Sequence, residues 1–494
     1  MSLLPLFVVF PLFMAFFIPM VGQRVKVLPD ILGNITTFLL LLLSLFTLGL
    51  SGTYAVGGWP APLGIIMVLD GFASLMLFIV ALISFAVTLY SINYMEIYTS
   101  KTRYYSLFLL MVAGMNGVII TGDIFNMYVF LEIASIASYA LVAFGCQHEE
   151  LEASFKYLVL GSMASTFILL GIAFLYGSYG TLNLAHLARQ ISEIGTTPAS
   201  NCALCLFMAG FGLKAALVPF HPWLPDAHPS APAPISAMLS GLVIKTLGIY
   251  ALARLVFNVF GLTPVLSQIL VVFGLLSMVV GVFLAIGQWD YKRLLAYHSI
   301  SQIGYVTLGL GLGTPLGILG GIFHLVNHSV FKSLLFLNAG SVEYTLGTRD
   351  MTKMGGLKER MPVTNGTALT GAFSIAGLPP FNGFWSKLLI IMACVQAKRF
   401  SLAGWAVLVS IITLASFMKV QRYVYFGKLK EEWKGVSEVP LAMRTAMVLL
   451  AVFCVLMSLL LLPEGRNLIL TPAVNALLSG RAGYLQLTWS AFFK

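Results

Sequence analysis

Long apolar runs recur along the whole chain and are separated by short polar segments. Residues 3–20, 31–50, 155–176 and 446–462 are examples, each roughly twenty residues long. A helix of about twenty apolar residues crosses the hydrocarbon core of a bilayer. The pattern therefore predicts an all-α polytopic membrane protein without a sizeable soluble domain.

About fourteen transmembrane helices are expected. They begin near residues 3, 30, 66, 105, 123, 154, 203, 233, 264, 293, 314, 365, 402 and 442. The first run has no basic residue before it and no small-residue cleavage site after it. We therefore expect a retained span and not a signal peptide.

The loops between these spans fall alternately on two sides, and one side is much richer in Lys and Arg. The richer side holds 16 basic residues: Arg24, Lys26, Lys101, Arg103, Lys156, Lys292, Arg293, Arg349, Lys353, Lys358, Arg360, Arg422, Lys428, Lys430, Lys434 and Arg444. The other side holds 7: Arg189, Arg254, Lys398, Arg399, Arg466, Arg481 and Lys494. Cytoplasmic loops carry an excess of Lys and Arg. We expect the protein to lie in the cell (inner) membrane, with the richer side facing the cytoplasm and both termini on the outer face.

Composition narrows the function classes. Hydrophobic residues make up 59% of the chain and charged residues 9%, whereas about a quarter of a soluble domain is charged. The net charge of +10 needs no nucleic-acid partner, because basic loops account for it. Cys202 and Cys205 have CxxC spacing, but no second pair or nearby histidine completes a metal set, so we interpret them as apolar packing residues. We expect no cofactor, no metal and no catalytic redox site in this chain.

Six charged residues lie inside the predicted spans. They are Glu132, Lys214, Lys245, Lys332, Lys387 and Lys419. A charge within a membrane is expensive, so such residues face the protein interior or a wet cavity and mark ion paths. These residues are therefore candidates for ion translocation.

His324, His328 and Lys332 follow one another at intervals of four residues. Each step turns a helix by about 400°, so the three side chains share one stripe that rises about 12 Å. Neutral imidazole accepts a proton on one nitrogen and donates one from the other. The stripe predicts a proton wire; the alternative is that the three groups only bond to neighbouring helices. No carboxylate or cysteine lies on the stripe to complete a metal site.

Glu132 and Lys214 form a second candidate group. If they meet, the carboxylate stabilises the ammonium, and separating them frees the lysine to release its proton. The alternative is a static buried pair that fixes how the helices pack.

Two spans are interrupted by proline. The first break follows Lys214 and contains Pro219, Pro222, Pro225, Pro229, Pro232 and Pro234; the second contains Pro379, Pro380 and Gly383 and is followed by Lys387. A helix cannot continue through such segments. We expect irregular backbone at both places, facing protein or water and not lipid.

Matched interrupted spans in two halves point to inverted repeats. We predict two five-helix repeats with a broken helix in each, because an odd number of spans reverses the second copy. The predicted division is residues 1–104 for spans 1–3, 105–260 for the first repeat, 261–426 for the second, and 427–494 for a cytoplasmic loop, span 14 and the C-terminal tail. Lys245 and Lys419 lie in the last helices of the two repeats, and Lys419 either takes part in transport or extends to a membrane surface.

These residues resemble a known family, the antiporter-like membrane subunits shared by respiratory complex I, Mrp-type Na⁺/H⁺ antiporters and group 4 membrane-bound hydrogenases. The matching stretches are residues 122–143, 214–254, 289–305, 323–342 and 377–388. The likeness covers about residues 60 to 425.

The resemblance implies roles for individual residues. Glu132 matches the glutamate of the fifth span, and Lys214 matches the lysine of the broken seventh span. Lys245 matches the eighth-span position; His324, His328 and Lys332 match the eleventh-span relay; Lys387 matches the broken twelfth span. A hydrophilic axis across the membrane plane, coupling neighbouring subunits, is implied.

The stretch 226–254 looks most like the hydrogenase-linked members, whereas the stretch 377–387 looks closer to the Mrp D subunit and to complex I subunits with a lysine there. We favour a subunit of a hydrogenase-type or related redox-driven complex. A D-type Mrp subunit or a complex I antiporter-like subunit is the alternative. The resemblance implies partners that include homologous or small Mrp-like membrane subunits and a peripheral redox arm. It also implies that the transported ion is H⁺, or H⁺ together with Na⁺. A stand-alone solute transporter and a membrane scaffold are the competing functions; the chain itself carries no flavin, haem or iron–sulfur motif, so any redox chemistry belongs to partners.

Overall fold

The structure is a computed structural model that describes residues 1–22 and 25–488. Arg24 and Lys494, two of the loop charges used above, lie outside the described residues. Ten helices among those residues are long and apolar enough to cross a membrane. The expected all-α polytopic class is confirmed, with one small addition: a two-stranded hairpin of β1 (Gly52–Ala55) and β2 (Ile66–Leu69).

The N-terminal half is a series of helices. Their bounds are α1 (Leu6–Val21), α2 (Leu28–Thr47), α3 (Gly71–Tyr94), α4 (Lys101–Ile120), α5 (Ile124–Val142), α6 (His148–Tyr179), α7 (Leu184–Ile194), α8 (Pro198–Lys214) and α9 (Leu224–Ser230). A single rod then combines α10 (Ala233–Met238), η3 (Leu239–Tyr250), α11 (Ala251–Ala253) and η4 (Arg254–Phe260). The third span, expected near residue 66, begins at Gly71 because residues 66–69 are paired in the hairpin.

The C-terminal half repeats the pattern of long and interrupted helices. Its elements are α12 (Pro264–Ile286), α13 (Tyr291–Gly311), α14 (Pro315–Leu346), α15 (Pro362–Ala376), α16 (Asn382–Gln396), α17 (Phe400–Val420), η7 (Gln421–Phe426), α18 (Leu441–Leu456), η9 (Met457–Leu461), α19 (Pro463–Gly465), η10 (Arg466–Leu470), α20 (Thr471–Leu478) and α21 (Gly480–Thr488). Short 3₁₀ turns are η1 (Val56–Gly58), η2 (Met95–Ile97), η5 (Met351–Lys353), η6 (Leu357–Glu359) and η8 (Glu431–Trp433). The count of fourteen spans, the inverted repeats and the domain boundaries remain predictions.

Both proline-rich segments interrupt their helices as expected. Helix α8 ends at Lys214 and the next helical residue is Leu224, while α15 ends at Ala376 and α16 begins at Asn382. Gly377 closes α15 with φ 82°, a conformation that glycine adopts without steric cost. Residues 215–218 and 223 of the first break are buried, whereas Pro219 and Pro222 in it, like Pro379 and Pro380 in the second, are exposed.

Close backbone contacts at both breaks require glycine. A Cβ on Gly248 would lie 2.5 Å from the Cα of Ala215, and a Cβ on Gly383 would overlap the carbonyl oxygen of Ser374. Real Cβ atoms do not approach backbone this closely. The two glycines therefore let η3 and α16 lie directly against the interrupted segments.

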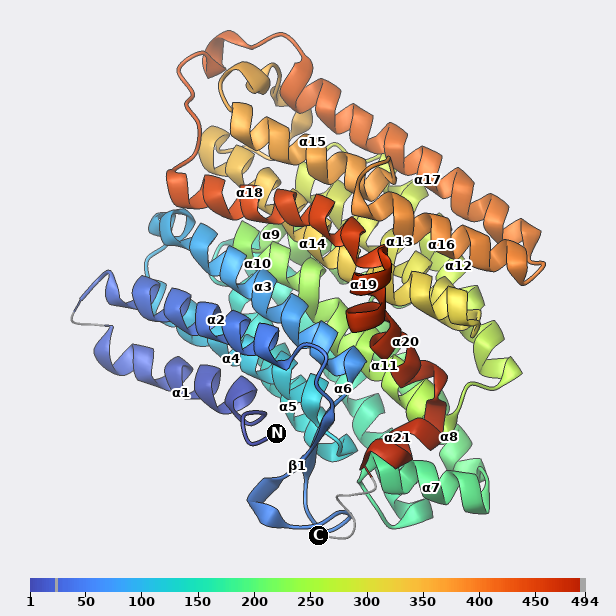
Figure 1. Ribbon diagram of the computed structural model, residues 1–494. Coiled ribbons are helices and arrows are strands. Elements are labelled where there is room, and N and C mark those ends of the chain that lie inside the picture. The colour runs from blue at the N-terminus through green and yellow to red at the C-terminus, as the bar shows by residue number, and fades with distance from the viewer. Residues whose placement is uncertain (23–24, 489–494) are drawn as a thin grey trace.

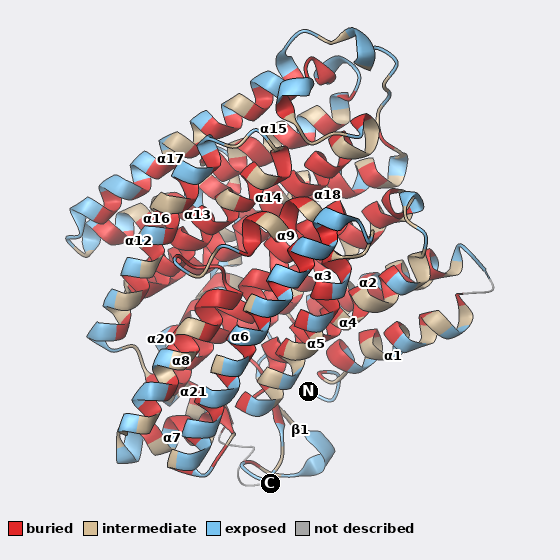
Figure 2. Cartoon of the chain, turned by 180° about the vertical axis from the view of Figure 1, so that it is seen from behind, coloured by how far each residue is buried: buried red, intermediate tan, exposed pale blue. Residues whose placement is uncertain are grey.

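Two elements form the centre of the bundle, as Figures 1 and 2 show. The apolar windows of α14 and of the rod 233–260 are fully buried, whereas those of α6, α17 and α18 are mostly not. Helix α14 packs against α10, η3, α13, α15, α16 and α18. The helices that carry most of the candidate polar residues are thus the ones most completely enclosed by protein.

The loops gather on two opposite faces. On the basic-rich face, Lys101 pairs with Asp30 at 2.7 Å and Lys430 donates to the Thr352 carbonyl. On the other face, backbone bridges join Met67 to Thr121 and residue 123 to residue 183. The alternation of all loops between the two faces, the cytoplasmic side and the position of the termini remain predictions.

Two assignments of loop charges were wrong. Lys292 is 2% exposed and pairs with Glu343 at 2.5 Å. Arg254 lies inside the central rod and forms a two-pronged ion pair with Asp70, at 2.5 and 2.6 Å. Both are buried because each has a carboxylate partner that the local sequence does not reveal. Cys202 and Cys205 also differ from expectation: they are exposed and contribute no buried packing.

Candidate functional site

Glu132 on α5 and Lys214 on α8 face one another. The Lys214 Nζ lies 3.9 Å from Glu132 Oε1, but it donates more closely to Ser135 Oγ at 2.9 Å and to the Tyr139 hydroxyl at 3.2 Å. The Ser165 hydroxyl donates to the same Glu132 oxygen. The ammonium is thus held mainly by neutral hydroxyls, and the ion pair is loose.

Exposure differs across this pair. The Lys214 side chain is 4% exposed and the Glu132 side chain 26%. Lys214 is also the last residue of α8, where the partial negative charge of a helix C-terminus favours a cation. The lysine is therefore fixed inside the bundle, while the glutamate lies at its edge.

Lys245 lies on η3 in the core of the bundle. It is fully buried, and its ammonium donates to the carbonyl oxygen of Ser240 one turn earlier. The Ser240 hydroxyl in turn contacts the Ser299 hydroxyl on α13 at 2.7 Å. These contacts join the central rod to the second half of the chain. Turns of π-helix such as η3 are rare and often occur at functional sites.

The three residues of the predicted stripe are all fully buried on α14. The rings of His324 and His328 are nearly parallel, with centroids 6.2 Å apart. His324 contacts Ser386 Oγ at 2.9 Å and Gln302 Oε1 at 3.2 Å, and it thus links α16 with α13. Because the Gln302 Oε1 can only accept, Nε2 carries the proton of a neutral His324, and Nδ1 accepts from the Ser386 hydroxyl.

His328 and Lys332 differ from His324. Within residues 1–22 and 25–488, neither the two ring nitrogens of His328 nor the Lys332 ammonium has a hydrogen-bond partner. The Lys332 ammonium instead lies over the Phe336 ring, 5.6 Å from its centroid. Unpaired buried polar groups are uncommon and call for an explanation such as a catalytic role. A purely structural role therefore explains His328 and Lys332 less well than it explains His324.

Lys387 lies on α16 beside the second break. Its ammonium donates to the Ile375 carbonyl at 2.7 Å and to Ser410 Oγ at 3.1 Å, and it lies 4.9 Å from the centroid of the Tyr305 ring. Ile375 is in the last turn of α15. Lys387 thus meets the C-terminal end of an interrupted helix through its ammonium, whereas Lys214 is itself the last residue of one and donates to hydroxyls of α5.

The candidate residues form two groups. His324, His328 and Lys332 lie on α14, against which both η3 with Lys245 and α16 with Lys387 pack. The Glu132–Lys214 pair stands apart, since no hydrogen bond or ion pair in the described part of the chain joins Lys214 to Lys245. Helices α8 and η3 nevertheless pack together.

Lys419 is placed differently from the other five charged residues. It donates to the carbonyl oxygens of Ile286 and Gln288, at 2.7 and 2.6 Å, and lies over the Trp289 ring. These carbonyls belong to the C-terminal end of α12, where a cation is favourable. The contacts support the interpretation that Lys419 extends to the basic-rich face.

Several further histidines and asparagines lie among the buried candidate residues in the centre of the bundle. They were not singled out from the sequence. His298 on α13 contacts Ser416 Oγ at 2.8 Å. Asn327 and Asn382 bond to each other between α14 and α16. His228, on α9, is fully buried near Phe336. A search for neutral polar residues within apolar helices would have found them.

The fold and these residues match known proteins. Residues 121–413 match the family model described as the transmembrane region of NADH:quinone oxidoreductase and Mrp antiporters. The chain belongs to this family. Residues 56–105 match the model for the N-terminus of chain 5 of NADH-ubiquinone oxidoreductase, complex I.

Individual relatives extend the match. A D-type Na⁺/H⁺ antiporter protein from Alkalihalophilus pseudofirmus is 37% identical over 376 residues, which is 76% of each chain. A chain of the Mrp complex from Dietzia sp. DQ12-45-1b superposes with a TM-score of 0.91 at 30% identity, covering 99% of both chains. A chain of the archaeal membrane-bound sulfane sulfur reductase, a respiratory membrane complex, gives 0.91 at 32% identity, covering 99% of this chain and 100% of that one.

The family match and the solved structures agree on a multi-pass antiporter-like subunit. The chain is therefore a membrane subunit of an assembly related to the Mrp antiporter or to complex I, with other membrane subunits as partners.

Proposed function

We propose that this chain translocates protons, or exchanges Na⁺ for H⁺, within a multisubunit ion-pumping complex of the cell membrane. The observation that supports it most is a set of titratable side chains, each at most 2% exposed, in the centre of the bundle: Lys245, Lys332, His328, His324 and Lys387. Ionisable residues buried in membrane helices are expensive and mark ion paths.

The chemistry of each group fits proton transfer. A neutral imidazole receives a proton on one nitrogen and passes one from the other, and both nitrogens of His328 are free for this among the described residues. Protons would pass from Lys245 through Lys332, His328 and His324 to Lys387. The rings of His324 and His328 are neighbours, with centroids 6.2 Å apart, which supports a transfer step between these two residues.

Glu132 and Lys214 would act as the switch at one end of the path. While Glu132 is near, it stabilises the charge on Lys214; when it moves away, the buried ammonium loses that support and releases its proton. The loose distance of 3.9 Å and the partial exposure of Glu132 support a pair that can separate.

The type of complex is a finer proposal. The sequence favours a hydrogenase-type or related redox-driven complex with a peripheral redox arm, and the likeness to an archaeal respiratory complex supports it. The D-type Mrp subunit is the second candidate, supported by the Alkalihalophilus relative and the Mrp structure. Purification of the chain in mild detergent would distinguish them by whether redox proteins or only small membrane subunits copurify.

Transport by the reconstituted complex tests the function itself. A His324→Ala/His328→Ala variant should assemble, as judged by native gel, and lose formation of a pH gradient in proteoliposomes. Ser341→Ala is the matched control: Ser341 is also buried on α14 but contacts Tyr90 and Met447 and not the stripe. Full transport by the assembled double variant would refute the proton path.

A further inference from the structure

Two cavities lie side by side on the basic-rich face, above the break between α9 and α10. One has a volume of about 560 Å³ and extends to Asp226; the other has a volume of about 420 Å³ and extends to Lys292. Glu149, Ser230 and Arg349 line both cavities. These three residues therefore form the wall between them.

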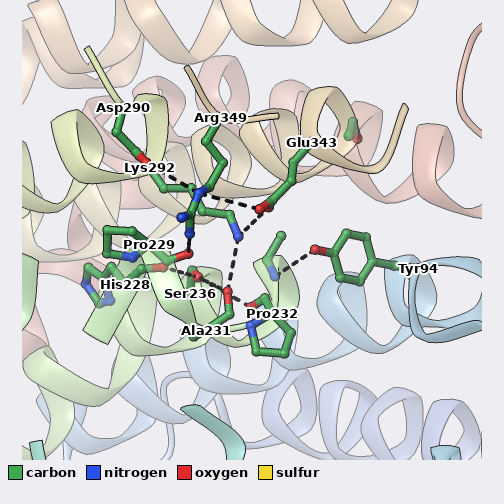
Figure 3. Close-up of polar contacts among 12 residues, drawn as sticks. Tyr94, His228, Pro229, Ala231, Pro232, Ser236, Asp290, Lys292, Glu343 and Arg349 are labelled. Atoms are coloured by element: carbon green, nitrogen blue, oxygen red, sulfur yellow. Dashed lines mark hydrogen bonds and ion pairs between the residues drawn. The ribbon is translucent and has the colours of Figure 1, made fainter. Parts of the chain in front are cut away.

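The floor of both cavities is interrupted backbone. Pro232 has no N–H and cannot continue the hydrogen bonding of α9. The carbonyls at the C-terminal end of α9 also lack intrahelical donors. Two cations from the second half of the chain donate to them: Arg349 to the Pro229 carbonyl, and Lys292 to the Ala231 carbonyl at 3.1 Å (Figure 3). Charge-assisted hydrogen bonds of this kind are among the strongest in proteins.

Two buried polar residues, Ser236 and His228, lie beneath this floor. The Ser236 hydroxyl donates to the His228 carbonyl at 2.7 Å and approaches the Ala231 carbonyl at 3.2 Å (Figure 3). Neither ring nitrogen of His228 has a hydrogen-bond partner among the residues that the structure describes. The His228 ring packs against Phe336 with ring centroids 5.1 Å apart, and the Lys332 ammonium lies over the same Phe336 ring. The break thus separates the cavities from the central lysines.

Arg349 joins three further elements through carboxylates. Its guanidinium lies 3.1 Å from Glu149 on α6, 3.3 Å from Asp290 before α13, and 3.8 Å from Glu343 on α14. Burial disfavours its charge, but Asp290 and Glu343 outweigh burial and raise the pKa of Arg349, so the guanidinium stays charged. One side chain therefore ties the break to both halves of the chain.

We propose that Arg349 is a positioning residue that holds the α9–α10 break against α14 and keeps the two cavities separate. Its release would join the cavities and admit water and protons past the break to Ser236 and His228 beneath it. The inference rests on the proposed function, because it assigns the side from which protons reach the central path.

The geometry requires arginine. A guanidinium presents five N–H donors in a planar fork, whereas an ammonium is a single charged point. Arg293 provides a natural contrast, since it lines the larger cavity and pairs with Asp226 at 3.3 Å. No hydrogen bond in the described chain joins Arg293 to a carbonyl of the break.

Thiol labelling of the full complex in membranes tests this inference. Ser236→Cys is placed in a chain whose five native cysteines are replaced, and its reaction with a charged methanethiosulfonate is timed. Arg349→Gln should speed labelling roughly tenfold, equivalent to about 1.4 kcal/mol, and Arg293→Gln should leave the rate unchanged. An unchanged rate in Arg349→Gln, or equal acceleration in both variants, would overturn the proposal.

A conservative variant guards against misfolding. If Arg349→Gln fails to assemble on a native gel, Arg349→Lys takes its place and should accelerate labelling by a smaller factor of roughly three, because it keeps the charge and loses the fork. An unchanged rate in the assembled lysine variant would overturn the inference. Labelling requires no transport, so its outcome is independent of whether the histidine variants abolish proton movement.

Discussion

The Lys214 ammonium lies 3.9 Å from the Glu132 carboxylate, farther than its 2.9 Å hydrogen bond to Ser135. A static buried ion pair would be expected to close to direct contact, because leaving a buried charge uncompensated is costly. Here neutral hydroxyls hold the lysine while the glutamate stays at the edge of the bundle. The arrangement favours a pair that exchanges partners.

Disabling either member of this pair should stop transport. Lys214→Arg keeps the positive charge but cannot release a proton, and Glu132→Gln removes the charge with little change in size. We expect each variant to lower the rate of pH-gradient formation by roughly a hundredfold, at the low end of what positioned proton-transfer groups contribute. Proteoliposomes containing the intact complex provide the measurement.

Surface variants of the same chemical type serve as controls. Lys434→Arg and Glu464→Gln alter exposed side chains and should transport normally. A scaffold predicts the opposite for Lys214→Arg, since arginine preserves a static pair. Near wild-type transport by an assembled Lys214→Arg complex would therefore support the scaffold.

The imidazole of His328 should matter more for transport than for stability. His328→Ala removes a fully buried ring that packs against His324 and Phe331, so it leaves a cavity and should lower the melting temperature moderately while the complex still assembles. The transport rate should still fall by roughly tenfold or more, because the proton path is interrupted. Comparing the rate per assembled complex with its melting temperature separates the two effects, and a variant that is unstable but transports normally would contradict the assignment.

The polar stripe and both breaks could be predicted from sequence because each depends on local rules. A spacing of four residues fixes the face of a helix, and prolines disfavour continuation of the helix before them, although Pro225 and Pro229 lie within the short helix α9. His324, His328 and Lys332 thus lie together on α14 as expected, and α8 and α15 end before Pro219 and Pro379.

The remaining errors concern contacts between distant segments. Lys292 and Arg254 lie near helix ends, where basic residues usually mark loops, yet Glu343 and Asp70 bury them. Their partners are distant in sequence, so the pairing cannot be predicted from the spacing of residues along one helix. Neutral bonding residues such as Ser135 were missed for the same reason, because a serine in an apolar helix has no distinctive spacing.

We expect Lys387 to be needed for transport and Lys419 to be needed only for stability. Lys387→Met removes a buried ammonium bonded near the second break and should reduce transport roughly tenfold or more. Lys419→Met removes a cation from the C-terminal carbonyls of α12 and should cost about 0.3–1 kcal/mol of stability, with transport per assembled complex retained. Loss of transport in Lys419→Met without loss of stability would instead place Lys419 in the ion path.

We expect the Arg254–Asp70 pair to stabilise the folded protein and to have no part in transport. Both side chains are buried, with contacts of 2.5 and 2.6 Å, and Asp70 also accepts from the Ala73 N–H at the start of α3. Asp70→Asn keeps an N-cap but leaves Arg254 unpaired.

Breaking a buried pair by neutralising one partner costs about 3–5 kcal/mol, whereas an exposed pair is worth about 0–1 kcal/mol. Asp70→Asn should therefore lower the melting temperature of the purified complex clearly, and Glu193→Gln, which breaks the exposed pair with Arg189, should not. The rate of pH-gradient formation per folded complex should be unchanged in both, because neither pair contacts the central path. Equal melting temperatures for the two variants, or a transport defect in a fully folded Asp70→Asn complex, would show that the pair has another role.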